Sequence, residues 1–373
     1  MRFIDIILDV ESISLVKDNR PMVKRAINAT LQRVHQAHNF PYYLQDKGVI
    51  QTTAEYTDGT VTAVNGDATI TGILTAFTSA MAGRKFRKGG ETAFYRIKSV
   101  TSGTELELET PYYGTTDATG ETFSIFKDEF RLAPDVDQYK FLRQIENGEI
   151  LFSTHPANFD SAYPAPSFMG NPNIEVMVGT QMDTYDTGSV SGSSGSKTLT
   201  GVGTGWTSVE GLGQGSQLTI GDYVYMVKSV DSDTQITLYD KLAQAVTAGT
   251  SYSILLNNLR VQLLNIPDEA KNLYYRYFRI PQPLVNDYDI PDMPMGWDWI
   301  LPYGALSQMF LQKGDLSKSY QITEARFLAE LDKMKLKVGS FTPDRIYHKK
   351  PMQRRRNVSL GQEPSGYRWY YCG

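Results

Sequence analysis

The sequence predicts an α+β protein with a helical-bundle core, two homologous small β-barrel or β-sandwich insertions and an extended C-terminal arm. Three observations predict this class: amphipathic patterns near both ends, a β-rich stretch that occurs twice between them, and a basic aromatic tail. A chain of 373 residues can hold two or three domains. We expect the core in residues 1–57, 127–185 and 257–340, the β modules in 58–126 and 186–256, and the arm in 341–373.

The first expected helix begins near Pro21. Asp18 and Asn19 come just before this proline, which is a typical helix start. Apolar residues then recur at helical spacing, at Val23, Ile27, Leu31 and Val34. The helix is expected to stop before Pro41.

The β-rich stretch is an internal repeat. Thr71-Gly72 and Phe77-Thr78-Ser79 match Thr200-Gly201 and Trp206-Thr207-Ser208 at an offset of 129 positions. Tyr95 and Lys98-Ser99-Val100 match Tyr225 and Lys228-Ser229-Val230 at an offset of 130. A chance similarity of composition would not keep this register through separate segments. We therefore interpret the two stretches as copies of one module.

Each copy has the pattern of short strands. Residues 105–109 alternate polar and apolar side chains, and residues 235–239 do the same, which is typical of a half-buried strand. Turn signals such as Asn65-Gly66 and Gly221-Asp222 separate the runs. Several short strands of this kind favour a small barrel or sandwich.

The segments around the modules are of mixed type. A strand is expected over residues 174–178, with residues 259–264 or 273–280 as its possible partner. Residues 297–313 form a helical pattern that ends at Gly314. A third helix, capped by Asp315 or Ser317, would place Ile322, Ala325, Leu328 and Leu331 on one face. The short turn between these two helices predicts antiparallel packing.

No catalytic constellation is visible, and we expect no enzyme activity, no cofactor and no metal. The four histidines, at positions 35, 38, 155 and 348, lack further ligands at metal-binding spacing. Asp287, Asp289 and Asp292 could supply oxygen ligands to calcium, although adjacent prolines favour a structural loop. The glycine runs at 201–205 and 211–215 fit no phosphate-binding pattern and are interpreted as turns.

Charge is distributed unevenly. The net charge of −4 divides into −10 for residues 1–344 and +6 for residues 345–373. Three interpretations of this tail compete: nucleic-acid binding, a solubilising tail, and an arm that docks on another subunit. The aromatic residues favour the arm, because Tyr, Trp and Arg are common interface anchors. Its candidate residues are Arg345, Lys349, Lys350, Arg354, Arg355, Arg356, Tyr367, Trp369, Tyr370 and Tyr371.

Two terminal features bear on the compartment. The N-terminus is not expected to be a signal peptide, because Asp5 and Asp9 interrupt its apolar run. Cys372 is the single cysteine, so no internal disulfide can form. We therefore expect synthesis in a cytoplasm.

The order of segments carries a family resemblance. The series is residues 23–31 and 39–44, the first module, residues 127–135, then 264–268 and 274–277, and finally Trp299-Ile300-Leu301 with Gly304-Ala305 and Gly314-Asp315. This series covers nearly the whole chain and resembles the head-to-tail adaptor (connector or neck) proteins of tailed bacteriophages.

The resemblance implies a non-enzymatic virion protein. Such adaptors have a helical-bundle core and form a twelve-subunit ring beneath the portal protein. They line the channel through which double-stranded DNA passes without sequence-specific binding, and a tail or nozzle protein lies below. The C-terminal segment commonly reaches the portal, so the basic aromatic arm takes that place here. The expected location is the virion neck, with host cytoplasm during assembly and no membrane.

An alternative interpretation makes the β modules the functional part. A tail fibre, baseplate or surface carbohydrate-binding protein could use aromatic residues of the modules to stack on sugars. The candidates are Tyr95, Tyr112, Tyr113, Trp206 and Tyr225.

Overall fold

The computed structural model describes residues 1–338 apart from 15–18, 117–119, 145–147, 164–169 and 313–317. The predicted fold class is wrong: the chain is mostly β-sheet, with 38% strand and 25% helix, and contains several large sheets instead of a helical-bundle core with small insertions. The physical reason is that residues assigned to the core pair over long sequence distances. Local patterns indicated strands there, but they did not reveal how far the sheets extend.

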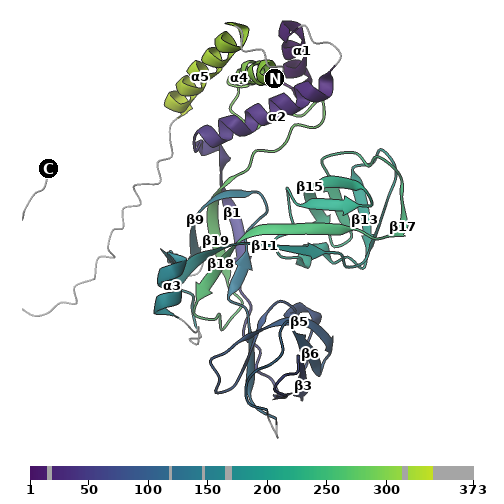
Figure 1. Cartoon of the computed structure of the whole chain (residues 1–373), viewed down its shortest axis with the longest axis vertical. Coiled ribbons are helices and arrows are strands. Elements are labelled where there is room, and N and C mark those ends of the chain that lie inside the picture. The colour runs from purple at the N-terminus through teal and green to yellow at the C-terminus, as the bar shows by residue number, and fades with distance from the viewer. Residues whose placement is uncertain (15–18, 117–119, 145–147, 164–169, 313–317, 339–373) are drawn as a thin grey trace, which may run out of the picture. The chain divides into compact units, whose positions relative to one another are not determined.

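Helices from both ends of the chain pack together (Figure 1). They are α1 (Phe3–Ser14), α2 (Arg20–Ala37), α4 (Ile300–Gln312) and α5 (Lys318–Val338). The predicted start of α2 is confirmed, because the side chain of Asn19 caps the helix by accepting a hydrogen bond from the Met22 amide at 3.4 Å. Val23, Ile27, Leu31 and Val34 are all buried, as their spacing predicted.

Helices α4 and α5 form the predicted antiparallel pair. The Ser307 hydroxyl donates to Glu324 Oε2 at 2.7 Å, while Gly304, earlier in α4, lies against Phe327, later in α5. Gly304 is needed here, because a Cβ at this position would lie 2.3 Å from Thr30 Cγ2 and 2.8 Å from the Phe327 ring. Of the four residues predicted to share one face of α5, Leu331 is buried, whereas Ile322, Ala325 and Leu328 are exposed.

A three-stranded sheet has the order β1-β19-β9, with β1 at Leu44–Gln51, β19 at Asn272–Arg279 and β9 at Val136–Gln144. Both pairs are antiparallel. The helix η1 (Pro41–Tyr43) leads directly from α2 into β1. Tyr43 and Phe278, on η1 and β19, belong to the same buried cluster as the four helices, so the sheet and the helices share a core.

A ten-stranded sheet contains the second module. Its path is β10 (Phe152–Thr154), β11 (Ile174–Tyr185), β18 (Ser253–Leu264), β14 (Gln217–Ile220), β15 (Tyr223–Ser232), β16 (Gln235–Leu238), β13 (Thr198–Val202), β12 (Ser189–Gly192) and β17 (Val246–Thr250), and β8 (Glu129–Arg131) pairs with β18 beside it. The partner of residues 174–178 is the first of the two predicted segments, because Ile174 pairs with Leu264. The second module is therefore a continuation of a larger sheet.

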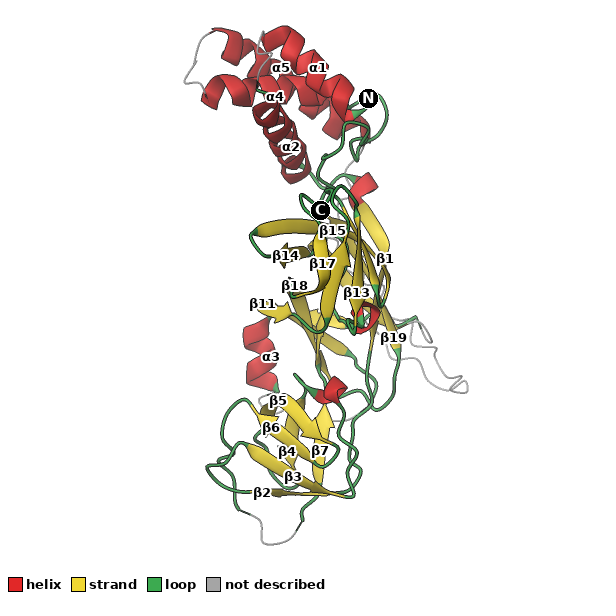
Figure 2. Ribbon diagram, turned by 90° about the vertical axis from the view of Figure 1, so that its right-hand side faces the viewer, coloured by secondary structure: helices red, strands yellow, loops and turns green. Residues whose placement is uncertain are grey.

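The first module is a separate six-stranded sheet (Figure 2). Its order is β2 (Thr60–Ala63), β3 (Thr69–Ile73), β6 (Glu105–Leu108), β5 (Tyr95–Ser102), β4 (Lys85–Lys88) and β7 (Phe123–Phe126). The short helices η2 (Ser79–Met81) and η3 (Trp206–Ser208) follow the equivalent strands β3 and β13, and α3 (Pro156–Ala162) precedes β11.

The sequence repeat is confirmed in the strand registers. The pairs β5·β6 and β15·β16 have irregularities at equivalent positions, after Ile97 and Val100 in one and after Val227 and Val230 in the other. A hydrogen-bonding pattern also recurs: Tyr95 Oη accepts from the Tyr113 amide at 3.1 Å, and Tyr225 Oη accepts from the Ala243 amide at 3.2 Å. The two modules therefore share the same local strand pairing.

The two repeats pair with each other through β8 and β18. Arg131 pairs with Arg260, its own counterpart at an offset of 129. Phe130 pairs with Val261, and the equivalent pair on the other side is joined by a hydrogen bond from the Leu132 amide to the Leu259 carbonyl at 2.8 Å. The antiparallel register is thus symmetric about the Arg131–Arg260 pair.

Candidate functional site

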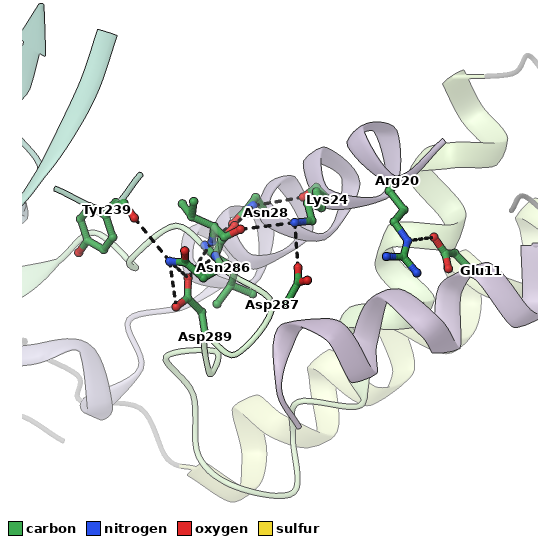
Figure 3. Close-up of polar contacts among 10 residues, drawn as sticks. Glu11, Arg20, Lys24, Asn28, Tyr239, Asn286, Asp287 and Asp289 are labelled. Carbon is green, nitrogen blue, oxygen red and sulfur yellow. Dashed lines mark hydrogen bonds and ion pairs between the residues drawn. The ribbon is translucent and has the colours of Figure 1, made fainter. Parts of the chain in front are cut away.

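The loop of residues 283–292 forms hydrogen bonds to α2, α1 and the second module (Figure 3). The side chain of Asn28 both donates to the Leu284 carbonyl and accepts from the Leu284 amide, each at 2.8 Å. Lys24 Nζ lies 3.0 Å from Asp287 Oδ1. A longer contact of 3.5 Å joins Asn286 Nδ2 to the Tyr239 carbonyl in the second module.

The acidic residues of this loop have structural partners. Asp289 Oδ2 accepts from the amides of Val285 at 2.9 Å and Asn286 at 2.7 Å. The carbonyls of Asp289 and Asp287 accept from the first amides of α1, those of Phe3 at 2.7 Å and Ile4 at 2.9 Å. The loop therefore satisfies backbone donors that a helix start leaves open.

Calcium binding by this loop finds no support. Asp292 pairs with Arg279, and burial raises the pKa of Asp292. No group of three or more His, Cys, Asp or Glu residues in the described part of the chain is arranged to hold a metal ion.

A network of charged side chains surrounds the pair formed by β8 and β18. We call it the charged junction, and its residues are Lys85, Arg96, Lys127, Asp128, Glu129, Arg131, Asp183, Glu210 and Arg260. Lys85 Nζ lies 2.9 Å from both Asp128 Oδ2 and Glu129 Oε1. Glu129 Oε2 lies 2.5 Å from Arg260 Nη1 and 3.6 Å from Arg96 Nη2. Glu129 is therefore the common partner of three cations.

The environment of Glu129 keeps it charged. Burial alone would raise its pKa, but Lys85, Arg260 and Arg96 together hold the pKa below the ordinary glutamate value. Asp128 is 1% exposed, and its Oδ2 also accepts from Gln262 Nε2 at 2.8 Å. These buried charges are compensated by direct contacts, as buried ions require.

The other half of the charged junction joins the repeats. Arg131 pairs with Asp183 of β11, and burial lowers the pKa of Arg131. Glu210, from the second module, lies 2.5 Å from Lys127 Nζ and accepts from the Arg131 amide at 3.1 Å. A cavity of 280 Å³ lies within this network. Both cations and carboxylates line it, and their ion pairs join segments of the two repeats.

Glu175 is a buried acid that forms no ion pair with the residues that the structure describes. It lies on β11, is 1% exposed and accepts a hydrogen bond from the Tyr139 hydroxyl. Burial raises its pKa to about 7, and the contacts from Tyr139 and the Leu142 backbone offset only part of that effect. Its Oε1 atom has no hydrogen-bond partner among the described residues.

The aromatic residues proposed for sugar stacking are mostly buried. Trp206 is 1% exposed, Tyr112 is 0% exposed and Tyr225 is 5% exposed. Trp206 Nε1 donates to the Tyr252 hydroxyl at 2.9 Å inside the second module. Tyr113 is the exposed member of the set, and Tyr95 is half-buried. The five side chains therefore form no sugar-binding platform.

The remaining sequence-predicted residues divide into two groups. The ten residues of the arm and His348 lie outside the described residues. His35 Nε2 lies 3.2 Å from Asp137 Oδ2, and His155 caps α3 by accepting from the Ala157 amide at 3.2 Å. The run at 211–215 lies in turns, as predicted, whereas the run at 201–205 begins inside β13 and leaves the strand only after Val202. Gly203, Gly205, Gly211 and Gly215 have positive φ.

Sequence reasoning missed the charged junction and Glu175. One signal was present for the junction: the offset of 129 that defines the repeat also maps Arg131 onto Arg260. No comparable signal marked Glu175, because a single acid in a strand pattern usually faces solvent.

A scan against protein-family models and a search of curated proteins each found no match to this chain. In the part of the chain that the structure describes, no helix has both the length and the apolar character needed to cross a membrane.

Proposed function

We propose that this protein is a structural head-to-tail adaptor of a tailed-phage virion that assembles as a ring beneath the portal. The observation that carries the proposal is the helical layer built from both chain ends, with apolar side chains exposed on α1 and α5. Exposed apolar side chains on a helical layer favour association with another protein surface. The order of segments along the chain, which resembles that of adaptors, supports the same class.

The chemistry of the described residues supports a scaffold role. The charged junction uses its carboxylates and cations against one another, and the loop at 283–292 uses its acids to hold backbone amides. Both sites connect segments that are distant in sequence. Such contacts suit a protein that must keep its shape while a genome passes.

The test is the symmetry of the purified full-length chain. Native mass spectrometry and rotational class averages of stained particles are expected to give a closed twelve-fold ring with a central channel. A trimer would indicate a fibre, and a monomer at every concentration and in the presence of a portal ring would overturn the proposal.

The arm has its own test. A chain truncated after Gly339 is expected to form rings that no longer dock on a portal ring, because residues 341–373 carry the basic and aromatic anchors. Co-assembly of the truncated rings with the portal would contradict the role of the arm and leave the ring itself unaffected.

A further inference from the structure

The outer face of α5 has the spacing of a helix–helix seam. Its exposed residues include Ile322, Ala325, Ala329, Asp332 and Leu336, which are separated by alternating steps of three and four. The two largest are strongly exposed, at 65% for Ile322 and 85% for Leu336. The opposite face already packs on the helical core through Phe327, Leu331 and Met334. Alternation of three and four is the pattern by which one helix packs along another.

The outer face of α1 is apolar and acidic. Leu8 is 49% exposed and Ile13 is 53% exposed, while Ile6, Ile7 and Val10 are fully buried on the inner side. Of the three α1 carboxylates, Asp5 pairs with Arg2 and Glu11 with Arg20, which leaves Asp9 exposed beside Leu8. In the last two turns of α5, Lys333 pairs with Glu330 and Lys335 with Asp332, while Lys337 is exposed beside Leu336. The two exposed faces are therefore alike in apolar character, and each adds one charge of opposite sign, Asp9 on α1 and Lys337 on α5.

These two faces do not cover each other within one chain. Both α1 and α5 pack against α4, and Figure 1 shows α4 between them. Leu8 and Ile13 on one side, and Ile322 and Leu336 on the other, all remain exposed in the folded chain. Two different complementary faces on one subunit favour head-to-tail contact, in which every copy uses one face on each neighbour. Such contacts close into a ring when the rotation allows it.

We propose that the outer face of α5 packs against the outer face of α1 of the next copy of this chain. The proposal rests on the ring-forming function proposed above and specifies its interface. Ile322 and Leu336 supply the apolar contacts on α5, and Leu8 and Ile13 supply them on α1. Asp9 of α1 meets Lys337 at the end of α5.

Two full-length variants and their mixture test this pairing. One variant carries Leu8→Asp and Ile13→Asp, and the other carries Ile322→Asp and Leu336→Asp. Each variant alone is expected to be monomeric, because one of its two faces is damaged. A one-to-one mixture is expected to give a heterodimer and nothing larger, since each partner contributes one intact face. Native mass spectrometry resolves these species.

The outcomes separate the interface from the function. If the wild-type chain forms rings and both variants still form them, the interface is wrong and the adaptor function stands. If the α1 variant forms dimers by itself, α5 pairs with α5 and the head-to-tail arrangement is wrong. A wild-type chain that never forms rings, even with a portal ring, overturns the function itself. Val202→Asp with Val224→Asp is the matched control, because these module residues are 68% and 61% exposed and should leave assembly unchanged.

Discussion

Replacing Glu175 by glutamine should stabilise the protein at alkaline pH and have little effect near pH 4.5. The carboxyl is buried, and burial raises its pKa from 4.5 to about 7. A raised pKa in the folded state means that folding favours the protonated form. The associated stability is fully present below pH 4.5 and is lost as the pH rises through about 7. Above that pH the folded chain must bury a charged carboxylate.

The size of the effect follows from the two pKa values. A rise from 4.5 to about 7 corresponds to about 3 kcal/mol of free energy of unfolding. Glutamine is neutral at every pH and keeps an oxygen that can accept from Tyr139. The difference in free energy of unfolding between the variant and the wild type should therefore grow by about 3 kcal/mol, in favour of the variant, as the pH rises from 4.5 to 8.5.

Urea unfolding followed by tryptophan fluorescence, at intervals from pH 4.5 to 8.5, measures this difference. Glu107→Gln is the matched control, because the pKa of the half-exposed Glu107 is lowered by its hydrogen bond to Lys98. A lowered pKa contributes stability that is present above the ordinary pKa value and lost only in acid. Above pH 5, the free energy of unfolding of this variant should therefore differ from that of the wild type by a constant amount. A difference between Glu175→Gln and the wild type that does not change with pH would refute the reasoning.

Four further substitutions probe the fold by urea unfolding at pH 7. Leu74 has φ of 57° and is 90% exposed, where the second repeat has Gly203 at φ of 69°, so Leu74→Gly should stabilise by about 1 kcal/mol. Gly203→Ala should lower the free energy of unfolding by a similar amount. If neither change alters the free energy of unfolding measurably, the strain argument is contradicted. Glu129→Gln leaves three cations without their shared carboxylate and should cost about 3 kcal/mol, and a neutral result would mean that the charged junction adds nothing. Gly304→Ala forces a methyl group against Thr30 and should lower the free energy of unfolding by about 2 kcal/mol. An unchanged value would mean that α2 and α4 move apart without loss of stability.

Local patterns predicted some parts of this fold and not others. The repeat could be found because the chain supplies its own comparison, and the matching irregularities in β5·β6 and β15·β16 confirm it. The start of α2 followed from Asn19 and Pro21, whose effects act within a single helical turn. The large sheets did not follow, because pairs such as Arg131 with Arg260 join strands that are far apart in sequence.

The two sites differ in the same way. The acids at 287–292 were visible as a sequence cluster, and the nearby amides of Val285 and Asn286 explain the structural role of Asp289. The charged junction draws Lys85, Glu129 and Arg260 from separate segments, so no window of sequence contains it. The buried aromatic residues of the modules were misread because composition does not distinguish an inward ring from an outward one.

The symmetric pairing of β8 with β18 has a consequence for how the chain can vary. An antiparallel pair in which a residue meets its own counterpart is the contact that two identical subunits make across a two-fold axis. Here both strands belong to one polypeptide, so the contact forms at any dilution and a substitution alters one side alone. The present residues already reflect this freedom, because Arg131 pairs with Asp183 while its counterpart Arg260 pairs with Glu129. Joining two copies in one chain has turned a self-complementary contact into two independently adjustable ones.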